Sequence, residues 1–318
     1  MSADHQVVGR NVPRVDALAK VTGQALYAGD LAVPGMLHGK VLRSPFPHAR
    51  IVRIDTAQAE ALPGVVAILT GQDLSDINPY YGHAIKDRPV VAIDRVRFVG
   101  EPVAAVAAMD EATADEALTL IDVEYEELPE LTTMDAALAE GAVPLHDNEN
   151  LQAGLFHGLG AMKPEGNVCY HHAFWRGDVS EAFAEAHVIV EGEYTFPAVY
   201  QYAMEPHTIV AEWNADGITV RASCQHPYLV RAELADLFGL PVTNVRIIVP
   251  YLGGGFGSKS YTKMEPVTVA LARKAGRAVR IANRVDEAMV TTRRHNMRCW
   301  MRTAATAEGR LLARECRM

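Results

Sequence analysis

The amino-acid sequence predicts a mixed α+β unit followed by an α/β region. In the first half, short β-like segments alternate with Pro and Gly, whereas in the second half strand-like and helix-like segments follow one another in turn. The length of 318 residues suggests roughly two domains. Hydrophobic residues make up 49% and charged residues 22% of the chain, which is ordinary for a soluble globular protein.

The first half starts with a polar lead-in over residues 1–20, and a mixed domain is expected over 21–135. Residues 57–64 (AQAEALPG) predict a short helix that ends at a Pro-Gly pair. Residues 110–121 carry apolar side chains at helical spacing, and Asp110 is the expected N-cap. Strand-like runs occupy 24–31, 35–44, 49–57, 65–70, 98–109 and 123–128.

A linker is expected over residues 136–169, where Pro, Gly and Asn are scattered and 148–150 read NEN. A second unit is expected over 170–318. Its amphipathic segment 227–240 predicts a helix with Gly239 near its end. A second helix is expected at 262–276, and strands at 187–196, 207–214, 217–225, 244–250 and 278–284.

Charge and hydropathy exclude several classes of protein. The net charge is −9 and no basic stripe is present, which disfavours a nucleic-acid binder. No apolar run approaches the roughly 20 residues of a membrane helix. The first residues lack the pattern of a secretory signal, so a cytoplasmic location is expected. The four cysteines (Cys169, Cys224, Cys299 and Cys316) lack CxxC spacing, which disfavours an iron–sulfur or zinc site in this chain and indicates isolated thiols.

The most informative segment is RIIVPYLGGGFGSKSY, residues 246–261, in which a strand-like run leads into four glycines around Phe256. Bare backbone of this kind can offer successive amides to an anion or to polar oxygens, or it can simply be a strand-to-helix turn. The spacing fits neither a nucleotide P-loop nor the dinucleotide-binding fingerprint, because Ser258 stands where those motifs need another residue. Gln225 ends an earlier strand, and one helix separates it from the strand that delivers the glycines. This topology brings Gln225 to the loop.

At this point the sequence resembles the large, molybdenum-binding subunit of the xanthine dehydrogenase, aldehyde oxidase and carbon monoxide dehydrogenase family. GGGFG with a small residue and Lys, after a strand ending in S-x-Q, is that family's loop. The resemblance extends over nearly the whole chain, with the first unit similar to the family's α/β hammerhead domain and the second to the first part of its molybdopterin-binding region. The matching segments, in order, are 14–31, 38–51, 98–129, 176–194 and 200–213.

The resemblance implies a molybdenum–molybdopterin cofactor, with the cytosine dinucleotide form as one option, and no direct protein ligand to the metal. It implies that Gln225 hydrogen-bonds an oxygen ligand of molybdenum, and that Gly254, Gly255, Phe256 and Gly257 lie against metal and pterin. It also implies partners: a second molybdopterin-binding chain that shares the cofactor, a 2Fe-2S subunit and a flavin (FAD) subunit. The implied reaction is hydroxylation of an N-heteroaromatic or related small molecule with water as the oxygen source.

Two departures from the family pattern leave alternatives open. Ser260 stands where purine-oxidising members have glutamate, which disfavours purines. The family's glutamate base belongs to a later region, so no catalytic base is assigned, and a natural split subunit and a fragment both remain open. An aldehyde- or carbon-monoxide-oxidising member is one alternative function, and a non-catalytic fragment or assembly protein without cofactor is another.

Further candidates for the substrate pocket are Tyr200, Tyr202 and Glu205, together with Phe256 and Ser260. Glu205 could have the raised pKa of a general base, but a structural carboxylate that orders the loop is the favoured interpretation. Core packing is the favoured interpretation of the tyrosines.

Overall fold

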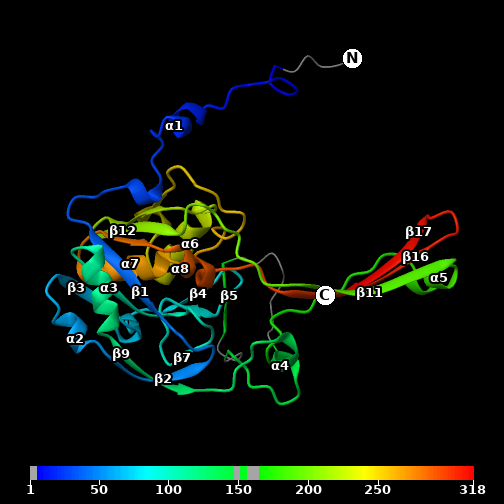
Figure 1. Ribbon diagram of the computed structural model, residues 1–318, viewed down its shortest axis with the longest axis horizontal. Coiled ribbons are helices and arrows are strands. Elements are labelled where there is room, and N and C mark those ends of the chain that lie inside the picture. Colours follow the sequence, from blue (N-terminus) through cyan, green and yellow to red (C-terminus); the bar gives the residue numbers. More distant parts are fainter. Residues whose placement is uncertain (1–5, 147–150, 156–164) are drawn as a thin grey trace.

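A seven-stranded sheet forms the main body of the chain in a computed structural model that describes residues 6–146, 151–155 and 165–318 (Figure 1). Its strand order is β14-β13-β12-β15-β1-β8-β3. Because β15 pairs in parallel with β1, strands from both halves of the sequence share this sheet. The strands are β1 (Leu37–Arg43), β3 (Val65–Leu69), β8 (Pro102–Ala108), β12 (Thr208–Asn214), β13 (Gly217–Ala222), β14 (Val245–Ile248) and β15 (Val279–Ala282).

Strand β8 shows how the sheet is covered on both faces. Ala105 and Ala107 enter the larger apolar core with helix α7 (Glu265–Ala275). Ala104 and Val106 point the other way, into a smaller core with α3 (Glu111–Thr119). Alternate side chains of a strand lie on opposite faces, so the continuous apolar run at 98–109 reflects burial on both faces.

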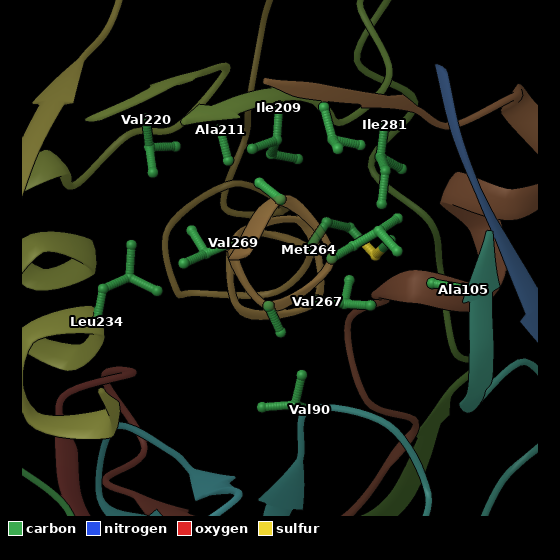
Figure 2. Close-up of a cluster of buried hydrophobic side chains, with 14 of the residues drawn as sticks. Val90, Ala105, Ile209, Ala211, Val220, Leu234, Met264, Val267, Val269 and Ile281 are labelled. Atoms are coloured by element: carbon green, nitrogen blue, oxygen red, sulfur yellow. The ribbon is translucent and has the colours of Figure 1, made fainter. Parts of the chain in front are cut away.

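Helix α7 lies at the centre of the larger core. Figure 2 shows Val267 and Val269 on this helix, with the sheet on one side and α6 (Pro227–Leu237) on another. Gly276 ends α7 in the left-handed conformation (φ 63°), which glycine adopts without a Cβ clash. The surrounding residues labelled in Figure 2 are Val90, Ala105, Ile209, Ala211, Val220, Leu234 and Ile281.

The element predictions for the first half largely hold. Asp110 caps α3 by accepting a hydrogen bond from the Thr113 amide at 2.8 Å, as expected. The strand expected at 24–31 is absent: Asp30 accepts from the Tyr27 amide and closes a short 3₁₀ turn, Ala28–Asp30. The remaining elements of this half include α1 (Ala17–Val21), β2 (Ala49–Asp55), α2 (Ala57–Glu60), β7 (Arg95–Val96), β9 (Asp122–Glu127) and α4 (Met134–Leu138).

Short pairings complete the body. Strand β4 (Tyr80–Tyr81) pairs with β6 (Arg88–Pro89), and β5 (Ile85–Lys86) pairs with β10 (Gln152–Ala153) within the expected linker. The NEN motif at 148–150 lies outside the described residues. The domain boundaries themselves stay a prediction. Among the described helices, none is long and apolar enough to cross a membrane.

A three-stranded arm projects from this body (Figure 1). It consists of β11 (Val188–Phe196), β16 (Met297–Ala305) and β17 (Leu311–Arg317), with α5 (Val179–Ala184) packed on it. On the face of the arm covered by α5, the Arg302 guanidinium carbon lies 4.3 Å from the centroid of the Phe183 ring. On the opposite face, apolar residues of β11 are solvent-exposed: Val188, Val190, Tyr194 and Phe196.

The arm also brings together two cysteines that the sequence indicated as isolated. The Sγ atoms of Cys299 and Cys316 lie 3.4 Å apart across β16 and β17. Both are free thiols.

Candidate cofactor-binding site

The topology places Gln225 beside the glycine loop. Strands β13 and β14 are parallel neighbours, so their carboxyl ends lie at one edge of the sheet. Gln225 follows β13 by three residues, and the loop connects β14 to α7. This is the juxtaposition that the strand–helix–strand pattern predicted.

Gln225 holds the loop with its side-chain oxygen. Oε1 accepts hydrogen bonds from the amides of Gly257 at 3.0 Å and Lys259 at 3.3 Å. The backbone amide of Gln225 donates to the Lys259 carbonyl at 2.8 Å. The other end of the same side chain is the Nε2 amide group, which can only donate. In the described part of the chain it has no hydrogen-bond acceptor, so Nε2 is free. Gln225 can therefore donate to an oxygen outside the protein.

Close packing explains why side chains are excluded from this loop. A Cβ added to Gly255 would lie 2.3 Å from Gln225 Oε1, and one added to Gly253 would lie 2.5 Å from the Glu205 Cβ. Neither distance is compatible with a real side chain. The immediate reason for these two glycines is thus contact with the protein itself, not only the approach of a ligand.

Three successive amides in the loop remain available. Those of Gly254, Gly255 and Phe256 find no acceptor among the residues that the structure describes, whereas their neighbours Gly253 and Gly257 donate to Glu205 and Gln225. Successive free amides form a concave donor surface for anions and oxygen ligands. Together with the free Gln225 amide, these donors fit the oxygen-rich molybdopterin group that the resemblance implies.

Phe256 projects from this loop under backbone strain. Its φ is 53°, in the left-handed region that bulky residues rarely adopt, and its side chain is 73% exposed. Tyr202 has a similar φ of 51° and is also exposed. These two are the described non-glycine residues with positive φ, and both are candidates from the sequence. Strain of this kind gathers at functional sites, where the surrounding structure imposes it.

A buried ion pair supports the loop from beneath. Lys259 Nζ lies 3.0 Å from Glu205 Oε2, and the same oxygen accepts from the Gly253 amide at 2.8 Å. The Lys259 side chain is 1% exposed and that of Glu205 is 12% exposed. Burial lowers the pKa of Lys259, while the hydrogen bond to Glu205 opposes this change. The geometry gives Glu205 the loop-ordering contacts of a structural carboxylate.

His207 adds a second support for the loop. Its Nε2 lies 3.0 Å from the Ser258 carbonyl oxygen, to which the ring donates. Burial lowers the pKa of His207 to about 4. The Ser258 hydroxyl in turn donates to the Gly255 carbonyl at 2.7 Å. The loop is thus fixed by side chains from the segment before β12 as well as by Gln225.

The other pocket candidates lie around the same loop with different exposure. Tyr200 is buried, and its ring centroid lies 5.1 Å from that of Tyr202. The Tyr202 hydroxyl donates to the Met289 sulfur at 3.6 Å. Ser260 is half-buried, and its amide donates to the Gly257 carbonyl at 3.3 Å. Whether these residues contact substrate stays a prediction.

A hollow of about 860 Å³ opens beside Phe256 and Gly257. Its basic lining was not predicted from the sequence. The run TRRH at 292–295 was a visible signal, but Arg88 lies in the other half of the sequence and carried none. The basic side chains of the lining are those of Arg88, Lys263, Arg293 and Arg294, and His295 lies beside them.

Comparison with known proteins identifies the family. The profile described as "Molybdopterin cofactor-binding domain" matches residues 162–318, and that described as "Aldehyde oxidase and xanthine dehydrogenase, a/b hammerhead domain" matches residues 22–129. The chain belongs to the xanthine dehydrogenase and aldehyde oxidase family of molybdopterin-binding subunits, as the sequence resemblance indicated.

Individual relatives agree with this assignment. The chain is 38% identical to a probable xanthine dehydrogenase subunit of Bacillus subtilis (strain 168), over 96% of this chain and 39% of that protein. It is 35% identical to the "Nicotinate dehydrogenase large molybdopterin subunit" of Eubacterium barkeri, over 100% of this chain and 71% of that protein. The crystal structure of quinoline 2-oxidoreductase from Pseudomonas putida 86 superposes with a TM-score of 0.84 at 34% identity, covering 97% of this chain and 38% of that one.

Proposed function

We propose that this chain is a molybdopterin-binding subunit of a multi-subunit molybdenum hydroxylase. The observation that carries the proposal is the arrangement at the glycine loop: Gln225 keeps its amide free while its oxygen holds the loop, next to three free backbone amides. These donors suit the oxygen atoms of a molybdenum–pterin group. The site residues Gln225, Gly254, Gly255, Phe256 and Gly257 are proposed on this basis.

When bound, molybdopterin with molybdenum would supply the two-electron oxidation and a water-derived oxygen. The protein's part is orientation and exclusion of water. Gln225 Nε2 would donate a hydrogen bond to an oxygen of the cofactor, and the free amides of Gly254, Gly255 and Phe256 would donate to further oxygens. The exposed Phe256 ring would screen the open side from solvent. None of these groups transfers a proton, so the catalytic base is proposed to come from outside this chain's described residues.

Partners are part of the proposal. The chain spans only 39% of the Bacillus relative, and the Eubacterium relative is named as one subunit of its enzyme. The exposed apolar face of the β11 arm supports contact with another polypeptide, because such surface associates readily. We propose a second molybdopterin-binding chain, with 2Fe-2S and FAD subunits as electron acceptors, and a cytoplasmic location. The pterin form, cytosine dinucleotide included, is left to measurement.

The proposed substrate class is an N-heteroaromatic compound. Xanthine, nicotinate and quinoline, which occur in the names of the relatives, are all N-heteroaromatic. Ser260 replaces the glutamate of purine-oxidising members, which favours non-purine rings. Turnover of aldehydes or carbon monoxide but not of heteroaromatic compounds would contradict this choice.

The test is native purification of the chain, followed by intact-complex mass and by molybdenum and iron content of the same fraction. The proposal predicts a heteromeric complex that contains both metals and oxidises a heteroaromatic compound. A lone 34.6 kDa chain without molybdenum would contradict it and favour a non-catalytic or assembly protein.

A further inference from the structure

The hollow beside the glycine loop has an unusual charge. It is bounded by Phe256 and Gly257 of the loop, by Arg88 and Phe98 of the N-terminal half, and by the segment that follows α8 (Val285–Thr291). Its described lining includes four cationic side chains and no Asp or Glu. The chain as a whole carries a net charge of −9, so this wall is opposite in sign to the rest of the protein. A concave wall of one sign attracts ligands of the other.

Several cations on this wall have no carboxylate in direct contact, although Glu233 and Glu265 act on Lys263, and Glu101 on Arg88, from farther away. Within the described ranges, no carboxylate forms an ion pair with Arg88, Lys263 or Arg293. The acidic residues nearest Lys263 are already engaged: Glu265 accepts from the Lys263 backbone amide, and Glu233 accepts from the Thr262 hydroxyl. These carboxylates raise the pKa of Lys263, but burial and Arg88 lower it to about 8. Burial outweighs these two carboxylates, so the half-buried ammonium is only partly compensated, and an anion in direct contact with it would stabilise it.

Aromatic rings accompany the cations. The Lys263 ammonium lies 5.5 Å from the centroid of the Tyr261 ring, and the Arg88 guanidinium lies 6.0 Å from that of Phe98. Phe256 stands at the end of the hollow that meets the loop. Rings beside cations suit a ligand that is both flat and negatively charged. The volume of about 860 Å³ is ample for a small aromatic molecule.

We propose that this hollow binds the carboxylate of a planar aromatic acid, which it presents to the glycine loop. Lys263 and Arg88 are assigned to the carboxylate, and Phe256 and Tyr261 to the ring. The inference rests on the proposed function, since it narrows the substrate class from N-heteroaromatic compounds to their carboxylates. It makes Lys263 and Arg88 determinants of specificity, separate from the residues that hold the cofactor.

The test is equilibrium binding to the 318-residue chain, measured by calorimetry, which needs no turnover. The probes are pyridine-3-carboxylate, its neutral amide and inorganic phosphate. The acid is expected to bind on the order of tenfold more tightly than the amide, as for a charge-assisted hydrogen bond of about 1.4 kcal/mol. Lys263→Gln should remove this preference, and Arg88→Gln should weaken it. Arg310→Gln, on an exposed turn away from the hollow, is the matched control and should change nothing.

Three results would overturn the inference: equal binding of acid and amide, a preference that survives Lys263→Gln, or binding of phosphate but not of the acid. Molybdenum content of the native complex is measured separately for Lys263→Gln and should equal that of the wild type. A wild-type complex that contains no molybdenum would contradict the proposed function alone. A complex that contains molybdenum, with a chain that binds acid and amide equally, would contradict this inference alone.

Discussion

The glycine loop and the β11 arm are organised in opposite ways. The loop is held by buried and half-buried side chains: Lys259 is 1% exposed, and Gln225, Glu205 and His207 all bond to loop backbone. The arm carries apolar residues that face solvent, with Val190 at 61% exposure. The loop is thus fixed before any ligand binds, whereas the arm displays surface that the described residues leave uncovered. A substitution in the loop should therefore lower the free energy of unfolding strongly, and a substitution in the arm only weakly.

The largest effect is expected for Lys259→Met. It would leave the Glu205 carboxylate buried without its cation, and breaking a buried pair costs about 3–5 kcal/mol. Chemical denaturation of the full chain measures this change. The double variant Glu205→Gln with Lys259→Met should recover part of the loss. On the arm, Arg317→Met removes the exposed pair with Glu315, and the free energy of unfolding should change far less because water screens that pair. Similar losses of stability for Lys259→Met and Arg317→Met would contradict the proposed difference between the loop and the arm.

The next effect is a pH dependence from His207. The unfolded histidine takes up a proton near pH 6.5, whereas the folded one does so only near pH 4. The unfolded state therefore binds more protons between these values, and stability falls as the pH falls through this window. The loss reaches about 3 kcal/mol at the lower end. His207→Gln keeps a donor for the Ser258 carbonyl but does not titrate. Chemical denaturation between pH 7 and pH 4 should show that the free energy of unfolding falls more steeply for the wild type than for His207→Gln. An equal fall in both proteins would show that His207 does not cause the pH dependence.

A smaller effect is expected for Gly255→Ala. The added Cβ would displace Gln225, and overpacking of this kind costs about 1–3 kcal/mol. Gly29→Ala is the matched control, because its Cβ would meet nothing within 4 Å and its φ is not positive. Thermal unfolding should separate the two variants. Equal melting temperatures would mean that Gln225 moves aside freely.

The smallest effect is expected on the arm. Val190→Thr keeps the β-branched shape on an exposed strand, so its effect on unfolding should stay within about 0.5 kcal/mol. If the arm contacts a partner, the same substitution should weaken the native complex in size-exclusion analysis. A marked loss of stability in the isolated chain would show that this face is packed by the chain itself.

The sequence predicted the loop better than the arm for physical reasons. A strand–helix–strand pattern constrains which strand ends meet, so the approach of Gln225 to the loop followed from local segments. Burial of Lys259 did not follow, because its partner Glu205 lies 54 residues earlier and lysines are exposed by default. The arm pairs β11 with β16, more than 100 residues apart, and β16 has no clear alternation. The basic hollow could not be predicted for the same reason, because its lining joins Arg88 and Phe98 of the first half with residues of the second half.

The most direct test of the proposed cofactor site is the molybdenum and pterin content of the natively purified complex for wild type, Gly255→Ala and Gly29→Ala, at a temperature where all three are folded. We expect full content for the wild type and for Gly29→Ala, with a marked loss in Gly255→Ala, because displacing Gln225 disturbs both the loop amides and the side-chain donor. Full molybdenum and pterin content in Gly255→Ala would contradict the claim that Gln225 and this loop hold the cofactor.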